Sequence, residues 1–158
     1  MNANEKLSGT KIYRTESLPI GGIPQWISLR SGNSNNPIML FLHGGPGTAQ
    51  ISFSRKSQRG LEDYFLVVNW DQRGSGRSYS RSLRKEDMEV ERFVADAEEL
   101  IELLLKRCIS KKFIWRGTHG EALSRLPSGE KARFSQSLFW DQTGCGDGSS
   151  SYLCRIQV

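Results

Sequence analysis

One short segment of this chain carries the residue types needed to bind a negatively charged reaction intermediate. It follows an apolar run at residues 38–42, which has the composition of a buried strand. Glycines allow the backbone N–H groups of a turn to approach a reacting carbonyl oxygen without interference from a side chain. We therefore predict an oxyanion-binding loop directly after this strand, formed by His43, Gly44, Gly45, Pro46 and Gly47.

A second polar segment follows the next apolar run along the chain. Residues 64–70 are almost continuously apolar, and Asp71, Gln72, Arg73 and Gly74 come directly after them. We expect these four residues to support the oxyanion loop, with Asp71 and Arg73 bracing it through hydrogen bonds and an ion pair. Two runs that are apolar on both faces indicate strands of a buried parallel sheet.

The remaining patterns place these segments in an α/β architecture. Residues 10–30 predict a β-hairpin, because a Gly-Gly pair and a proline provide turn chemistry between two strand-like stretches. Residues 88–107 predict an amphipathic helix, since apolar side chains recur at i, i+3, i+4 and i+7. The stretch 48–63 is less regular, and residues 113–158 show neither helical nor strand periodicity.

The two loops and the helix together resemble the proline iminopeptidase family of α/β-hydrolase serine peptidases. The resemblance is carried by residues 43–47, by residues 68–78 and by a Phe-Val-Ala-Asp segment at residues 93–96, and it covers about residues 8–108. It implies that a serine attacks the substrate carbonyl, a histidine accepts the serine proton, and an aspartate orients the histidine.

The resemblance also implies roles for individual residues of the oxyanion loop. The N–H of Gly45 would be one oxyanion donor, and Pro46, which has no N–H, would set the shape of the turn. His43 would orient the loop, because the catalytic acid and base of the family come later in the chain. For the same reason Asp71 is interpreted as a supporting residue and not as the acid of a triad.

The nucleophile that the resemblance implies is absent from the printed sequence. The family carries it in a Gly-x-Ser-x-Gly turn after the next strand, and no such pentapeptide occurs here. Ser75 and Ser78 lack the full glycine pair and are interpreted as loop residues. We therefore predict an inactive, truncated α/β-hydrolase: the first strands of the sheet and one long helix in residues 1–108, and an irregular tail in residues 109–158. Without the missing strand, the strand at 38–42 is expected to form an open apolar edge.

Shifted reading frames offer one explanation for the missing nucleophile. Read from the third base of the printed codons, residues 116–123 permit Gly-His-Ser-Trp-Gly-Ser-Ala, which resembles the nucleophile turn of the family. From about residue 130, the frame that starts at the second base permits a segment resembling the family's sequence after that turn. Two single-base losses, near the codons of residues 111–112 and 124–129, would produce both shifts. The alternative is a genuinely divergent tail.

Composition and charge argue against several other classes of protein. The net charge of +5 is scattered, with no basic helix and no interleaved aromatic residues, so nucleic-acid binding is not expected. Three cysteines without metal spacing, and only His43 and His119 as histidines, argue against a zinc site. No metal or organic cofactor is expected. No apolar run has the length of a membrane span and the N-terminus lacks a signal-peptide core, which favours a cytoplasmic protein without membrane attachment.

Three functional interpretations remain open from the sequence. The first is a peptidase that releases an N-terminal residue, preferably proline, from small peptides. The second is a related hydrolase of an ester or lactone, because the cap domain that sets specificity in the family is absent here. The third is a non-catalytic fragment, either a pseudogene product or an interaction protein. A phosphate-binding loop is disfavoured, because no Gly-Lys-Ser/Thr follows residues 43–45 and Gly74-x-Gly76 lacks a third glycine. The sequence does not indicate an oligomeric state.

Overall fold

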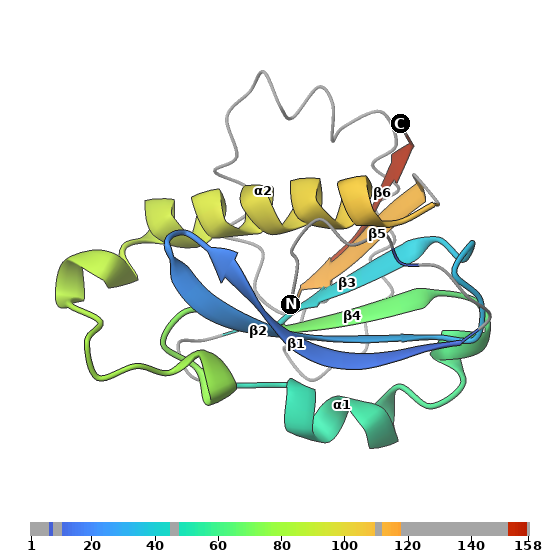
Figure 1. Cartoon of the computed structure of the whole chain (residues 1–158), viewed down its shortest axis with the longest axis horizontal. Helices are drawn as coiled ribbons and strands as arrows, with labels where there is room; N and C mark the ends of the chain where they lie inside the picture. Colours follow the sequence, from blue (N-terminus) through green and yellow to red (C-terminus); the bar gives the residue numbers. More distant parts are fainter. Residues whose placement is uncertain (1–6, 8–10, 45–47, 110–111, 118–151, 158) are drawn as a thin grey trace.

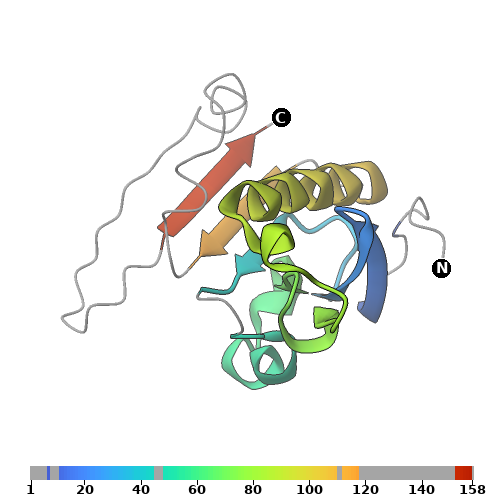
Figure 2. The same ribbon diagram turned by 90° about the vertical axis from the view of Figure 1, so that its left-hand side faces the viewer.

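The computed structural model describes residues 7, 11–44, 48–109, 112–117 and 152–157. A mixed sheet of six strands, in the order β1-β2-β4-β3-β5-β6, forms its centre. Helix α1 lies on one face of this sheet and helix α2 on the other (Figure 1), and the view turned by 90° shows the same arrangement (Figure 2). The elements are β1 (Ile12–Ile20), β2 (Ile23–Ser31), β3 (Ile38–Leu42), α1 (Ile51–Ser57), β4 (Leu66–Asp71), α2 (Val90–Arg107), β5 (Lys112–Gly117) and β6 (Tyr152–Gln157).

The predicted hairpin is confirmed as the antiparallel pair β1 and β2. Its turn consists of Gly21 and Gly22, whose φ angles are +56° and +76°. These angles lie in the left-handed region that glycine adopts without a steric penalty, which explains the Gly-Gly pair at this position. Strand β2 also pairs antiparallel with β4, so the hairpin extends the sheet on one side of the parallel centre.

The parallel centre of the sheet is also confirmed. Strand β3 pairs parallel with β4 on one side, where Leu42 lies opposite Trp70. Every residue of β4 is buried, as its nearly continuous apolar sequence predicts for a strand covered on both faces. The stretch 48–63, expected to be less regular, contains the short helix α1 and a single 3-10 turn at Leu61–Asp63 within otherwise irregular chain.

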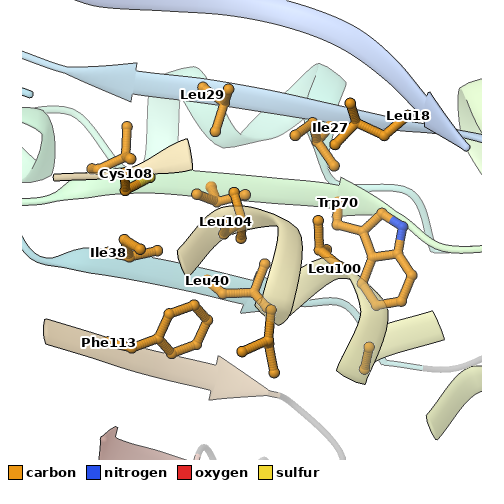
Figure 3. Close-up of a cluster of buried hydrophobic side chains, with 14 of the residues drawn as sticks. Leu18, Ile27, Leu29, Ile38, Leu40, Trp70, Leu100, Leu104, Cys108 and Phe113 are labelled. Atoms are coloured by element: carbon orange, nitrogen blue, oxygen red, sulfur yellow. The ribbon is translucent and has the colours of Figure 1, made fainter. Parts of the chain in front are cut away.

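Helix α2 closes one face of the sheet with its apolar stripe. It covers Val90–Arg107, close to the predicted span of residues 88–107. Leu100 and Leu104 are fully buried and pack among side chains of the sheet that include Leu40 and Trp70 (Figure 3). Burying such a stripe is the main driving force that holds a helix on a sheet. No helix among the described residues is long and apolar enough to cross a bilayer.

Two segments of the predicted irregular tail, residues 112–117 and 152–157, form strands instead, so the predicted open edge at β3 is also wrong. Strand β5 pairs parallel with β3, with Phe113 opposite Ile38, and β6 pairs antiparallel with β5. Strand β3 is therefore an interior strand. The Phe-Ile-Trp run at residues 113–115 has high strand propensity, and Phe113 is fully buried in the core, whereas the Gly- and Ser-rich composition of the surrounding tail concealed this short run. The tail between the two strands lies outside the described residues.

The burial of Phe113 makes the new strand testable. Replacing it with alanine removes a fully buried aromatic side chain from beside β3, so we expect Phe113→Ala to lower the free energy of unfolding by about 3–5 kcal/mol in urea. Ile109→Ala is the matched control, because Ile109 is 57% exposed and should change stability little. Equal effects of the two substitutions would contradict the docking of β5 on β3.

Candidate functional site

The two segments singled out from the sequence meet beyond the carboxyl ends of β3 and β4. His43 follows the last residue of β3, and Gln72 follows the last residue of β4. The backbone N–H of Gln72 donates to His43 Nε2 at 3.1 Å, and the Gln72 side-chain amide donates to the His43 carbonyl at 3.1 Å. Gln72 therefore fixes both the imidazole and the backbone at the start of the loop.

Asp71 fastens the other end of the same loop. Its carboxylate accepts the backbone N–H of Ile51, the first residue of α1, at 3.3 Å and that of Arg77 at 3.1 Å. Gly76 lets the chain pass close to this carboxylate, since a Cβ there would collide with Asp71 Oδ2. The consecutive residues Asp71 and Gln72 thus hold the loop of residues 43–50 at its two ends, although Gly45, Pro46 and Gly47 lie outside the described residues.

The described partners of Arg73 lie on α2, on the turn before it and on the β1–β2 turn, whereas the sequence-based expectation placed its ion pair at the oxyanion loop. Its ion pair is with Asp96 of α2, through Nε at 2.6 Å and Nη2 at 2.7 Å. Its Nη1 donates to the Asp87 carbonyl at 3.0 Å, and its Nη2 to the Gly21 carbonyl at 3.4 Å. The hydrogen bond to Asp96, more than the opposing burial, raises the pKa of Arg73 above its ordinary value. Arg73 therefore joins α2 to the β1–β2 turn.

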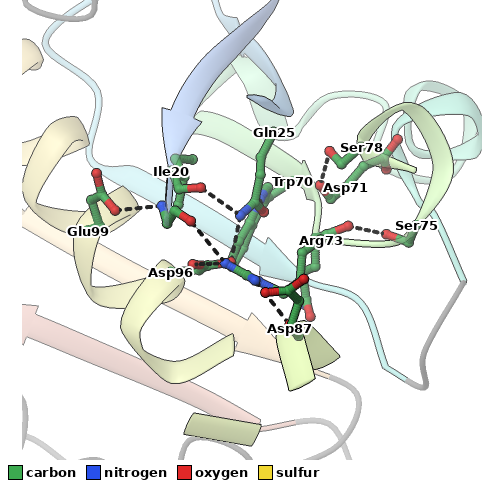
Figure 4. Close-up of polar contacts among 12 residues, drawn as sticks. Ile20, Gln25, Trp70, Asp71, Arg73, Ser75, Ser78, Asp87, Asp96 and Glu99 are labelled. Carbon is green, nitrogen blue, oxygen red and sulfur yellow. Dashed lines mark hydrogen bonds and ion pairs between the residues drawn. The ribbon is translucent and has the colours of Figure 1, made fainter. Parts of the chain in front are cut away.

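The pocket that receives Arg73 is a connected polar network between α2 and the sheet (Figure 4). Gln25 donates to Asp96 Oδ2 at 2.5 Å and accepts the indole N–H of Trp70 at 3.0 Å. The N–H of Gly21 donates to Glu99 at 2.7 Å. Gly74 is the last of the predicted supporting residues, and its φ is +74°. A Cβ at this position would lie 2.8 Å from Met88 Cε, so glycine lets the turn after Arg73 pass close to Met88.

Ser75 contributes a contact that the sequence analysis did not anticipate. Its hydroxyl lies 2.9 Å from His43 Nε2 and donates to the Gln72 carbonyl at 2.7 Å. A serine beside a histidine is the arrangement of an activated nucleophile. Here, however, the imidazole nitrogen already accepts the Gln72 N–H, and both side chains are buried, with 2% and 6% of their surface exposed. The pair stabilises the turn.

His43 is held as a neutral imidazole. Burial lowers its pKa below the ordinary value of 6.5, and a backbone hydrogen bond at Gly44 together with the Asp71 carboxylate opposes this only in part. A neutral Nε2 can accept the Gln72 N–H, so the charge state and the hydrogen bond agree. Among the described residues, no group of three His, Cys, Asp or Glu side chains could hold a metal ion.

Comparison with known proteins finds relatives that match the N-terminal part of this chain. A probable aminopeptidase, YbaC, of Bacillus subtilis (strain 168) is 41% identical over 102 residues, or 65% of this chain. The proline iminopeptidase of Neisseria gonorrhoeae is 36% identical over 114 residues. The N-terminal part of this chain resembles proline iminopeptidases. It spans about a third of the length of these relatives, 32% of the first and 34% of the second.

The fold agrees with this likeness to proline iminopeptidases. The crystal structure of a proline iminopeptidase-related protein from Thermus thermophilus superposes with a TM-score of 0.52 at 31% identity, over 59% of this chain and 32% of that chain. The described strands and helices thus form part of an α/β-hydrolase sheet. No protein-family model matches the chain.

The buried His43 predicts a specific dependence of stability on pH. Because the folded-state pKa lies below that of the unfolded chain, the unfolded state binds the proton first as pH falls through 6.5. The contribution of neutral His43 to the free energy of unfolding is therefore fully present above about pH 6.5. Below that pH the free energy of unfolding falls by up to about 1.4 kcal/mol per pH unit, until the pH reaches the lowered pKa of His43 in the folded state.

This dependence is measurable by urea unfolding between about pH 5 and pH 7.5. His43→Gln keeps a side-chain acceptor near the Gln72 N–H and does not titrate, so its unfolding free energy should fall less steeply with acid. His119 is present in both proteins, and the difference between their curves therefore isolates His43. Superimposable pH profiles would show that His43 is not held neutral.

The ion pair of Arg73 predicts a large effect at Asp96. Asp96→Asn leaves the Arg73 guanidinium buried without a counter-charge, so we expect a loss of about 3–5 kcal/mol in unfolding free energy. Glu102→Gln removes a carboxylate from the Glu102–Lys106 pair, whose side chains are 68% and 66% exposed, and should cost less than about 1 kcal/mol. Similar losses for both variants would place Arg73 in a solvated environment instead.

Proposed function

We propose that this chain is the N-terminal part of a hydrolase of the proline iminopeptidase type, which releases an N-terminal residue, preferably proline, from small peptides. The observation that carries the proposal is the position of His43 and Gly44. They follow β3, which lies between β4 and β5 in a parallel arrangement, and Gln72 binds the start of the loop. A loop held in this way can present backbone N–H groups to a tetrahedral oxyanion without reorganisation.

In this proposal the loop of residues 43–47 supplies one oxyanion donor, the N–H of Gly45, and the residue after the nucleophile supplies the other. A nucleophile turn belongs after the strand that neighbours β3. Strand β5 is that neighbour, and its last residue, Gly117, lies opposite Leu42, the residue before His43. The nucleophile would then emerge beside the oxyanion loop, which is the geometry that acyl transfer requires.

The position of β5 also supports the shifted-frame hypothesis. The frame that permits Gly-His-Ser-Trp-Gly begins at the codons of Arg116 and Gly117, where β5 ends. We propose that residues 1–108 are in the original frame, that the tail of residues 109–158 is out of frame, and that the printed chain is inactive because it lacks the nucleophile. A non-catalytic fragment with a genuinely divergent tail is the second candidate, favoured by the absence of Gly-x-Ser-x-Gly from the sequence.

Sequencing the gene across codons 105–130 and testing both proteins for activity decides between these candidates. We expect two missing bases, no reaction of the 158-residue chain with a serine-directed fluorophosphonate probe, and labelling of the repaired protein. The repaired protein should hydrolyse prolyl p-nitroanilide in preference to an aryl ester. The reverse preference would indicate an ester or lactone hydrolase.

Ser75→Ala supplies the matched control for this test. Because the Ser75 hydroxyl serves the turn at His43, the substitution should leave labelling of the repaired protein intact. Labelling of the 158-residue chain that disappears in Ser75→Ala would overturn the assignment. Printed codons that are incompatible with the shifted readings would leave the fragment hypothesis in its place.

A further inference from the structure

A cavity of about 410 Å³ is lined by residues of the β1–β2 hairpin and of α1. Helix α1 lies on the face of the sheet opposite α2 (Figure 1). The walls of the cavity include neither His43 nor Gln72. Three arginines line it, together with hydroxyl-bearing side chains, and none of its lining residues is acidic. Its lining residues include Tyr13, Arg14, Thr15, Ser28, Arg30 and Arg55. The cavity is therefore rich in donors and positive charge.

Arg30 is the buried member of this set, with only 6% of its surface exposed. Its Nη2 donates to Gln58 Oε1 at 2.8 Å. Gln58 is itself fixed by a reciprocal pair of amide hydrogen bonds with Asn69, at 3.0 and 2.8 Å. The guanidinium is thus clamped from inside the protein. Within the described part of the chain, its Nε and Nη1 have no hydrogen-bond partner.

The positive charge of the buried Arg30 guanidinium has no counter-charge among the ion pairs of the described residues. Arginine stays protonated at any physiological pH, so it cannot relieve its burial by losing the charge. Arg55 on α1 adds positive charge to the same cavity. Burying a charge is costly without a partner, so this cavity favours a counter-charge that enters from outside.

We propose that this cavity binds the phosphate or carboxylate group of a small molecule. Arg30 provides a buried, unpaired charge in the cavity wall, and Arg55 on α1 provides guanidinium donors from the exposed side. Hydroxyl groups of Tyr13, Thr15 and Ser28 lie in the same wall and can donate to further oxygens. A guanidinium group can donate two parallel hydrogen bonds to a carboxylate or to a phosphate, so the proposal covers both kinds of oxyanion.

The test uses the full 158-residue chain in chloride buffer, into which inorganic phosphate or acetate is titrated at constant ionic strength. We expect the unfolding temperature to rise saturably with one of the two anions, because a ligand that binds only the folded state stabilises it. A response to phosphate identifies a phosphorylated ligand, and a response to acetate identifies a carboxylate. No rise above the chloride control with either anion would overturn the proposal.

Variants distinguish a site from general attraction by a basic protein. Arg55→Gln should weaken anion binding about tenfold, as expected for the loss of one charged hydrogen bond. Arg81→Gln is the matched control, because it removes the same charge from an exposed residue outside the cavity and should leave binding unchanged. Equal weakening by both variants would show that the anion responds only to net charge, and would refute the site.

Arg30→Met gives a second and independent readout. It should abolish the response to the anion, yet unfold in chloride at the same temperature as the parent or higher, because an unpaired buried charge has been removed. A parent-like anion response in folded Arg30→Met would overturn the role of Arg30. If this variant does not fold, the Arg55→Gln and Arg81→Gln pair still decides the question.

Discussion

The buried ion pair between Arg73 and Asp96 is the interaction on which the arrangement of this protein depends. Arg73 follows the end of β4, and Asp96 belongs to α2. The pair also contacts the β1–β2 turn through the Gly21 carbonyl and the sheet through Gln25. Removing two charges from water costs free energy. The hydrogen bonds to Arg73 and Asp96 offset this cost, and they form only when α2 lies at one position along the sheet. The pair therefore specifies where the helix docks, while the apolar stripe supplies the attraction.

The two faces of the sheet use different chemistry. Under α2 the contacts are largely apolar, with Leu100 and Leu104 against Leu40. The buried charges on this face include the ion pairs Arg73–Asp96 and Arg107–Glu16. On the α1 face the interior is polar, with Arg30, Gln58 and Asn69 joined by hydrogen bonds. The apolar face stabilises the sheet, whereas the polar face holds charge that other groups can reach. The loop beyond β3 lies between these two environments and is anchored by Asp71 and Gln72.

Sequence patterns predicted those parts of the fold that depend on local periodicity. The strands at 38–42 and 66–71 and the helix at 90–107 have apolar runs or stripes long enough to be distinctive. Strand β5 was missed because its apolar run is three residues long and its place depends on a partner, β3, that lies more than seventy residues earlier. Propensity alone does not reveal such a pairing.

The same limit applies to the candidate site. The glycines of residues 43–47 are the basis for predicting an oxyanion loop. The partner of Arg73, in contrast, cannot be predicted from its neighbours in the sequence. Asp96 was among the residues that carry the family resemblance, yet its pairing with Arg73 depends on how α2 crosses the sheet. Ser75 was interpreted correctly as a loop residue, but its contact with His43 arises only when the ends of β3 and β4 come together.

Strands β3, β4 and β5 end at nearly the same level of the sheet, so the position of the residue after β5 depends on the number of residues in that strand. In a strand, successive side chains point to opposite faces, and each residue advances the chain by about 3.3 Å. One codon added to or removed from the segment Lys112–Gly117 would shift the next residue by that distance and turn its side chain to the other face of the sheet. Gene repair that keeps six residues in this strand would therefore keep the position and the facing of the residue that follows it, whatever the identity of the strand residues.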